Sequence, residues 1–273
     1  MILDALTHIS RDGDWFNTGL DASLPVLLAS MDQNGVDRAV LAGIPGAEDD
    51  DLLLAAVRTH PGRFLAVAGV DVCTDACADV CTDTFVDERG LSQRLEEVKA
   101  LGFSGIKLHP RFSGVPVTDP RIRKAVRLTG KLGLTALVCT IHRPPLPPLG
   151  RPVSDALYEL CRDCDDTRII LMHGGYTDLL ATSELIRPLE HVLLDLSTTL
   201  PRFHAASTGL DIRFLLETFD RRLCVGSDFP EGDMARIREL LLTLGEGLGT
   251  VEALMETLAA NTLRFFPACS EDA

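Results

Sequence analysis

Side chains that can bind a metal ion or move a proton follow five short hydrophobic runs of the sequence. His8, His109, His142 and His173 each end one run, and Asp228 ends another. If these runs are parallel strands of an α/β barrel, their carboxyl ends meet at one mouth, where such enzymes place their active sites. Imidazole and carboxylate together suit Zn²⁺, Mn²⁺ or Fe²⁺. A single strand-end histidine is often only a hydrogen-bonded core residue, but five such positions are hard to explain by packing.

Three cationic residues flank two of these histidines in the sequence. They are Lys107, Arg111 and Arg143. Side chains alternate along a strand, so Lys107 faces the same way as His109 and is expected at the mouth or in the interior. We therefore predict that His109 and the three cations bind a small substrate that carries a carboxylate.

The elements that must position these residues are strands alternating with helices. The predicted strands are Ile2–Ile9, Arg38–Ile44, Phe64–Val72, Ser104–His109, Thr135–His142, Arg168–His173, His191–Ser197 and Arg222–Asp228. Several of them are apolar without alternation, which is typical of parallel strands buried on both faces. Eight strand–helix units predict a (β/α)8 TIM barrel, in the α/β class. An open doubly wound sheet is the alternative, but no GxGxxG follows the first strand.

No linker or shift in composition divides the chain, so we predict one domain over residues 1–273. A helix over Val251–Ala260 follows the eighth unit and is extra to the barrel. An acidic insertion, Cys73–Gly90, and a proline-rich segment, Arg143–Pro152, interrupt the pattern. The proline-rich segment comes where a loop after a strand belongs, and we expect it to shape the mouth.

Composition excludes several classes of partner. Hydrophobic residues make up 46% of the chain and charged residues 24%, which is typical of a globular protein. The net charge of −14 disfavours binding to nucleic acid or to an anionic membrane. The sequence shows neither a membrane span nor an export signal, so we expect a cytoplasmic protein. Apolar helices such as Ser23–Met31 leave room for a homodimer.

The eight cysteines do not suggest a metal centre. Cys161 and Cys164 form a CxxC without a second pair, and the Cys73–Cys81 spacing lacks the pattern of an iron–sulfur loop. Cys139 and Cys224 lie in apolar runs, where cysteine is usually a small buried hydrophobic residue.

Five phrases of the sequence resemble the amidohydrolase-related family of the amidohydrolase superfamily. They are LDALTH, GIKLHP, LMHGG, VGSDFP and NTLRFF, in this order over nearly the whole chain. That group includes metal-dependent hydrolases, lactonases and nonoxidative decarboxylases. The resemblance implies an eight-stranded barrel with one divalent metal, usually zinc, at its mouth.

The resemblance also implies roles for individual residues. It makes His8, His142 and Asp228 metal ligands and His173 a catalytic or substrate-polarising imidazole. It places His109 at the site, where this residue either ligates the metal or binds substrate.

The sequence departs from the family at one ligand. The family's first-strand motif is DxHxH, whereas Asp4–His8 reads DALTH, so that Leu6 replaces the first histidine. Three protein ligands still suffice for a catalytic zinc with an open position. The other interpretation is that the site has lost its metal, as in certain lactonases of this group.

We therefore expect a hydrolase that acts on a small, carboxylate-bearing amide or lactone, with water activated by zinc or manganese. Asp228 would take the proton of this water and His173 would stabilise the oxyanion. Three alternatives stay open: a nonoxidative decarboxylase of a small or aromatic acid, a metal-free lactonase-like enzyme, and a non-catalytic barrel that binds a metabolite.

Overall fold

A computed structural model describes residues 1–45, 50–73 and 88–266. In this part of the chain, eight parallel strands follow one another around a single sheet in the order of the sequence. The strands are β1 (Leu3–Thr7), β2 (Arg38–Ala42), β3 (Phe64–Val70), β4 (Gly105–Leu108), β5 (Thr135–Cys139), β6 (Arg168–Met172), β7 (Val192–Asp195) and β8 (Leu223–Cys224). The helices are α1 (Leu24–Gln33), α2 (Asp50–Thr59), α3 (Glu88–Ala100), α4 (Pro120–Lys131), α5 (Val153–Arg162), α6 (Leu179–Ile186), α7 (Thr199–Phe203), α8 (Ser207–Thr218), α9 (Met234–Leu244) and α10 (Val251–Phe265).

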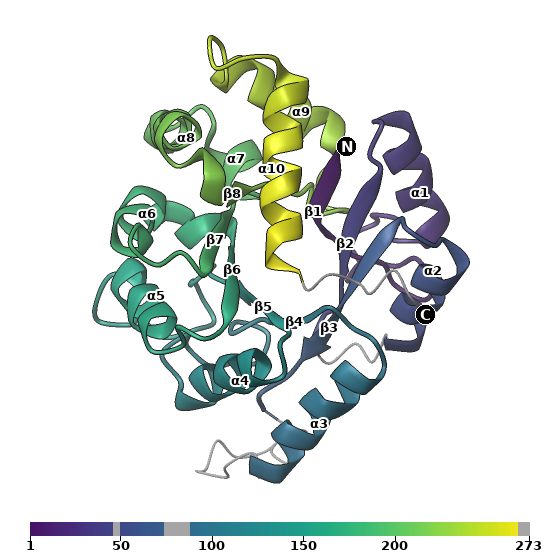
Figure 1. Cartoon of the computed structure of the whole chain (residues 1–273), viewed down its shortest axis with the longest axis vertical. Coiled ribbons are helices and arrows are strands. Elements are labelled where there is room, and N and C mark those ends of the chain that lie inside the picture. The colour runs from purple at the N-terminus through teal and green to yellow at the C-terminus, as the bar shows by residue number, and fades with distance from the viewer. Residues whose placement is uncertain (46–49, 74–87, 267–273) are drawn as a thin grey trace.

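Main-chain hydrogen bonds between the first strand and the end of the last one complete the ring. The Ala5 amide donates to the Val225 carbonyl at 3.1 Å, and the His8 amide donates to the Phe229 carbonyl at 2.9 Å. Glycine is required at position 226, because a Cβ there would lie 2.4 Å from the Leu6 nitrogen. The helices surround the strands (Figure 1). The predicted (β/α)8 TIM barrel is confirmed.

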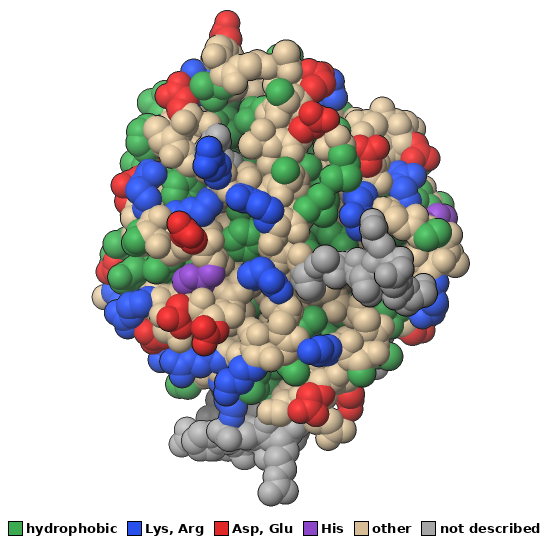
Figure 2. Space-filling model, viewed as in Figure 1, with side chains coloured by type: hydrophobic (Ala, Val, Ile, Leu, Met, Phe, Trp, Pro, Cys, Tyr) green, Lys and Arg blue, Asp and Glu red, His purple; other side chains and the backbone are tan. Residues whose placement is uncertain are grey.

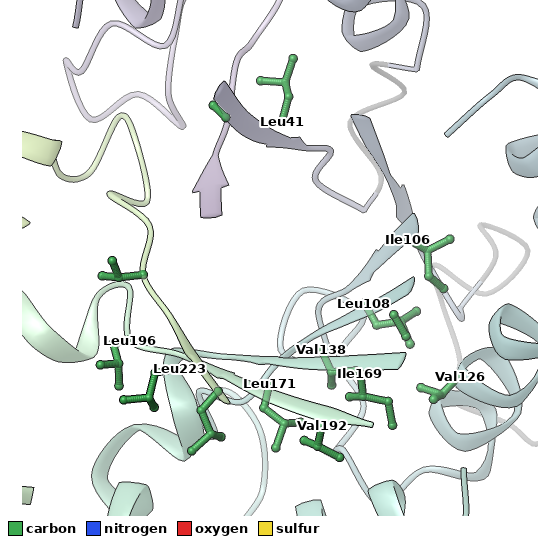
Figure 3. Packing of buried hydrophobic residues seen from close by; sticks show 14 of the residues in the cluster. Leu41, Ile106, Leu108, Val126, Val138, Ile169, Leu171, Val192, Leu196 and Leu223 are labelled. Atoms are coloured by element: carbon green, nitrogen blue, oxygen red, sulfur yellow. The ribbon is translucent and has the colours of Figure 1, made fainter. Parts of the chain in front are cut away.

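Alternation along each strand separates two hydrophobic layers. In β2, Leu41 belongs to the layer between strands and helices, whereas Val40 and Ala42 belong to the barrel interior. Figure 3 shows the outer layer, in which side chains such as Ile106 and Leu108 of β4 point away from the barrel interior. Lys107 lies between these two residues and therefore points inward, as the alternation predicts.

Helix α10 closes the end of the barrel opposite to the mouth. Its residue Phe265 and the following Phe266 belong to the interior cluster together with Leu3 of β1. The hydroxyl of Thr135, the first residue of β5, donates to the Phe265 carbonyl. In Figure 1 this helix crosses in front of the strands. The predicted extra helix is confirmed and runs to Phe265.

Figure 2 shows the same face of the molecule, and there Lys and Arg side chains lie among acidic ones. The net charge of −14 is therefore not displayed as a uniformly acidic surface on this side.

Each predicted strand ends one to four residues beyond the observed strand, and at β5 the difference moves a predicted site residue. The fifth run was expected to reach His142, but β5 ends at Cys139. The chain then enters the proline-rich segment, and prolines lack the N–H that a strand ladder needs. This difference of three residues decides which side chain of β5 faces the mouth.

Most of the acidic insertion predicted over Cys73–Gly90 lies outside the described residues, as do residues 46–49 and 267–273. Among the helices that the structure describes, none combines the length and the apolar character needed to cross a membrane.

Candidate active site

A cavity of about 140 Å³ lies at the carboxyl ends of the strands. Its lining includes seven of the eight residues that the sequence predicts for the site: His8, Lys107, His109, Arg111, Arg143, His173 and Asp228. They come from segments up to 220 residues apart in the chain, since His8 follows β1 and Asp228 follows β8. The structure therefore brings these residues to the one mouth that the barrel prediction requires.

His8, Lys107 and Asp228 form the deepest group of this cavity. The Nδ1 atom of His8 lies 2.6 Å from the Ala42 carbonyl oxygen. A carbonyl only accepts, so Nδ1 carries the proton and Nε2 keeps its lone pair. Lys107 Nζ lies 2.9 Å from that Nε2 and donates to it. Asp228 Oδ1 lies 3.4 Å from the same nitrogen.

Burial and charge decide the protonation of this group. Burial, followed by the adjoining Lys107 ammonium, lowers the pKa of His8 to about 4. Burial also lowers the pKa of Lys107, and the Asp228 carboxylate opposes that shift. Burial alone would raise the pKa of Asp228, but His8, His173 and Lys107 hold it well below its ordinary range. Near neutral pH the group therefore contains a neutral His8 imidazole and an ionised Asp228 carboxylate, beside the amino group of Lys107.

Asp228 is also fixed from the β7 side of the barrel. Its Oδ2 atom accepts a hydrogen bond from the Thr198 hydroxyl at 2.5 Å. Both residues have a positive φ, 58° at Asp228 and 59° at Thr198. Such φ values are uncommon outside glycine and are often found at functional sites.

His173, which directly follows β6, lines the same cavity. Its Nδ1 donates to the Ser197 carbonyl at 3.0 Å, and its main-chain N–H donates to Asp195 Oδ2 at 3.1 Å. Its own φ is 65°, and two glycines with positive φ follow it. The second, Gly175, passes so close to Thr182 that a Cβ would lie 2.2 Å from its hydroxyl oxygen. Glycine at this position thus lets the turn hold the imidazole against the barrel mouth.

The pKa of His173 moves in the opposite direction to that of His8. Burial lowers it, but hydrogen bonding with Cys139 and the charges of Cys139, Asp228 and Asp195 outweigh burial and raise the pKa to about 9. His173 is therefore an imidazolium near neutral pH.

Cys139, which the sequence analysis assigned to packing alone, interacts with two histidines of the site, His109 and His173. It is buried, as predicted, at the last position of β5. Burial raises the pKa of its thiol, but His109 and His173 outweigh burial and hold the pKa well below its usual value. Its position at a strand end was the available signal, because the same rule had singled out the histidines.

His142 is the predicted site residue that the structure does not bring to this group. It lies three residues beyond the end of β5, and its Nε2 contacts the Pro147 carbonyl oxygen at 2.8 Å. It is absent from the residues that line the cavity. Cys139 takes the inward position at the end of β5 instead.

Asp4 supports the site from below. Its carboxylate accepts from the Ser227 amide at 2.8 Å and from the Ser227 hydroxyl at 2.6 Å. Burial raises the pKa of Asp4 to about 7. These bonds tie β1 to the segment that carries Asp228.

Aromatic rings and arginines line the outer part of the cavity. Trp15 stacks on His8 with a centroid distance of 5.3 Å, and Phe112 stacks on His109 at 3.9 Å. Arg202 lies at the mouth with the predicted Arg111 and Arg143. Sequence reasoning missed Arg202 and Trp15, although Trp15 is the single tryptophan of the chain and follows His8 by seven residues. The outer part of the cavity is therefore aromatic and cationic.

The donors present do not fit the expected divalent metal. Leu6 is fully buried and offers no donor atom, and His142 is bound to the loop. The free lone pair of His8 accepts from the Lys107 ammonium. Within residues 1–45, 50–73 and 88–266, no group of three or more His, Cys, Asp or Glu side chains is placed to hold a metal ion.

Comparison with known proteins agrees with this fold. The sequence matches the family model described as Amidohydrolase over residues 13–264. No curated protein sequence shows significant similarity to the chain. An uncharacterized TIM-barrel protein from Bordetella bronchiseptica matches with a TM-score of 0.73 and 16% identity, over 96% of this chain and 99% of that chain.

Two further solved structures carry described activities. A probable 2-pyrone-4,6-dicarboxylic acid hydrolase from Acinetobacter baumannii, with citric acid bound, matches with a TM-score of 0.56 and 17% identity, over 96% of this chain and 92% of that chain. A 5-carboxyvanillate decarboxylase from Novosphingobium aromaticivorans, with bound manganese, matches with a TM-score of 0.66 and 13% identity, over 97% of this chain and 96% of that chain. At these identities the likeness shows the shared barrel.

Proposed function

The chain belongs to the amidohydrolase family, an enzyme family with hydrolases and decarboxylases among its structural neighbours, and we propose that it hydrolyses a small, flat, carboxylate-bearing lactone or amide. The observation that carries this proposal is the ionised Asp228 carboxylate, held beside the Lys107 ammonium and the His173 imidazolium in one cavity. A carboxylate that can hold a water molecule, facing two cations that can receive an oxyanion, is the arrangement that acyl hydrolysis requires.

The arrangement of charges suggests the order of events. Asp228 orients a water molecule, whose oxygen attacks the substrate carbonyl carbon, and the carbonyl oxygen becomes an anion between the two cations. The attacking water becomes strongly acidic as it bonds to carbon, so even a weak base such as Asp228 can take its proton. The bond to the leaving oxygen or nitrogen then breaks, and the proton passes from Asp228 to that atom.

The outer cavity supports the choice of substrate class. Arg111, Arg143 and Arg202 lie at the mouth, and Glu231 is the acidic residue that lines the same rim. The Glu231 carboxylate accepts from the Trp15 indole at 3.2 Å. Three guanidinium groups beside aromatic rings suit a planar acid, because arginine binds carboxylates with two parallel hydrogen bonds.

The family is generally metal-dependent, and the sequence predicts that zinc or manganese activates the water. The donor set around His8 does not fit a divalent ion, so the proposed steps use the chain's own side chains.

A second candidate is nonoxidative decarboxylation, and one observation favours it. His173 is a cation near neutral pH and could deliver a proton to a carbon atom as carbon dioxide leaves. The structural neighbour that decarboxylates 5-carboxyvanillate shares the barrel.

The test is a screen of lactones, amides and aromatic acids in water enriched in oxygen-18. We expect one heavy oxygen in the product carboxylate, and a loss of about 10²–10⁴-fold in kcat/KM in Asp228→Asn. Asp165→Asn, at an exposed position after α5 and away from the cavity, is the matched control and should change kcat/KM little. Release of carbon dioxide without incorporation of heavy oxygen would establish the decarboxylase instead, and undiminished activity of Asp228→Asn would remove Asp228 from the mechanism.

A further inference from the structure

We propose that the Lys107 ammonium takes the place of the catalytic metal ion, so that the electrophile of this enzyme is a side chain. The inference rests on the proposed hydrolysis for its chemistry and on the contacts of Lys107 for its geometry. It names a catalytic role for a residue that sequence analysis had placed among the groups that bind the substrate carboxylate.

The contact between Lys107 and His8 is the first observation. His8 Nδ1 donates to the Ala42 carbonyl, so Nε2 is the lone pair available for a metal ion. Lys107 Nζ lies 2.9 Å from that Nε2. A zinc ion bound there would lie at about 2.0–2.1 Å along the same lone pair. The ammonium and the metal therefore exclude each other at this atom.

The second observation is that the positions around His8 offer too few ligand atoms for a metal ion. Leu6, on the same inward face of β1 as His8, is fully buried and apolar. The inward position at the end of β5 is Cys139, and His142 is bound to the Pro147 carbonyl. Leu6 on β1 thus removes a ligand, and Lys107 on β4 supplies a positive charge.

The third observation is that Lys107 is held where a substrate oxygen can reach it. It belongs to strand β4, its residue is 2% exposed, and it lines the cavity together with Asp228. An ammonium has three N–H donors and His8 uses one of them. The other two N–H groups can donate to the Asp228 carboxylate and to the carbonyl oxygen of the substrate. A fixed positive charge on a buried side chain stabilises an oxyanion strongly.

Metal content is the direct test. We expect the purified enzyme to contain substoichiometric zinc and manganese by mass spectrometry, and to keep its activity after dialysis against EDTA. One equivalent of metal whose removal abolishes activity, and whose return restores it, would overturn the inference while leaving hydrolysis intact. Conversely, metal-free enzyme that releases carbon dioxide would overturn the hydrolase and leave the role of Lys107 standing.

Variants of Lys107 test the charge itself. Lys107→Met keeps the length of the side chain and should lower kcat/KM by about 10²–10³-fold, whereas Lys131→Met on the exposed end of α4 should not. Unchanged kcat/KM in Lys107→Met would contradict the inference. Trapping of Lys107 by borohydride in the presence of substrate would also contradict it, because a covalent imine would make the residue a nucleophile.

A binding measurement with zinc alone keeps the inference testable even if Lys107→Met is inactive for another reason. The double variant Leu6→His with Lys107→Met frees Nε2 of His8 and adds a second imidazole beside Asp228. We expect it to bind zinc about 10–100-fold more tightly than the wild type by titration calorimetry. Equal affinity of wild type and double variant would contradict the exclusion of the metal by Lys107.

Discussion

His8 and His173 line the same cavity, yet near neutral pH His8 is neutral and His173 is a cation. Each follows directly after a strand, each is buried, and each donates through Nδ1 to a main-chain carbonyl. The pKa of His8 is lowered to about 4 and that of His173 is raised to about 9. Burial favours the neutral form of both, so burial cannot account for the difference.

The difference between the two pKa values arises from the ionisable groups that lie near each ring. The Lys107 ammonium lies against Nε2 of His8 and adds to the effect of burial. Around His173, the groups that raise its pKa are acids, namely Cys139, Asp228 and Asp195. One half of the site thus presents a neutral acceptor and the other a cationic donor, which is the asymmetry that acid–base chemistry needs.

Removal of the cation on the His173 side should have the largest effect. His173→Gln keeps hydrogen-bonding capacity but loses the charge, and we expect kcat/KM to fall by about 10²–10³-fold. Steady-state kinetics on the substrate found by the screen measure it. His60→Gln, at the end of α2 and away from the cavity, is the control. Equal kinetics of the two variants would show that the charge of His173 does not act in catalysis.

The unfolding free energy of the protein at acid pH should depend on His8. Folded His8 binds its proton less tightly than the unfolded chain, so its contribution is complete above about pH 6.5 and is lost as pH falls through about 4. The shift corresponds to about 3 kcal/mol of unfolding free energy. Asp4, whose pKa is raised to about 7, titrates in the same range with the opposite sign.

Comparison of the wild type with His8→Gln separates the contribution of His8 from that of Asp4. Urea unfolding at pH 4 and pH 7.5 should show that the wild type loses about 3 kcal/mol relative to His8→Gln on acidification. Parallel losses in the two proteins would mean that His8 is not kept neutral by the fold.

A smaller effect is expected when one acid beside His173 is removed. Cys139→Ala should lower the pKa of His173 by about one unit, equivalent to about 1.4 kcal/mol, because Cys139 no longer favours the imidazolium. Titration of the ring followed by NMR measures it. Cys224→Ala is the matched control, since Cys224 is also buried at a strand end and is not among the groups that shift His173. An unchanged His173 pKa in Cys139→Ala would assign the shift to the aspartates.

The smallest effect is expected at the mouth of the cavity, for Arg143 and not for His8 or His173. Arg143 is exposed and solvent screens its charge, so Arg143→Gln should raise KM about two- to five-fold and leave kcat unchanged. Arg151→Gln, which removes an exposed pair with Glu159, serves as the control. A fall in kcat in Arg143→Gln would place this residue in the chemical step.

Much of the site could be predicted from the sequence because parallel strands end at one mouth. The rule that a polar residue directly after a strand faces the mouth identified His8, His109 and His173 without knowledge of their neighbours. Alternation along a strand predicted the inward direction of Lys107 in the same way. These are local properties of a strand, and eight strands in order leave few ways to arrange them.

The rule failed where a strand end could not be recognised locally. His142 continues an apolar run, but β5 ends at Cys139, where its pairing with Met172 of β6 ends. Cys139 therefore faces His173, and His142 belongs to the loop. The end of a strand depends on its neighbour in the sheet, which the run itself does not contain.

The sequence by itself thus determined the barrel and most of the residues that line its mouth, because periodicity and order along the chain are local information. Only the tertiary structure decided that Lys107 donates a hydrogen bond to His8, a residue 99 positions away, and that Asp228 lies beside His8. Those contacts set which groups are charged, because a pKa depends on burial and on the nearest charges in space. The chemistry of this site was therefore decided by neighbours in space and not by neighbours in sequence.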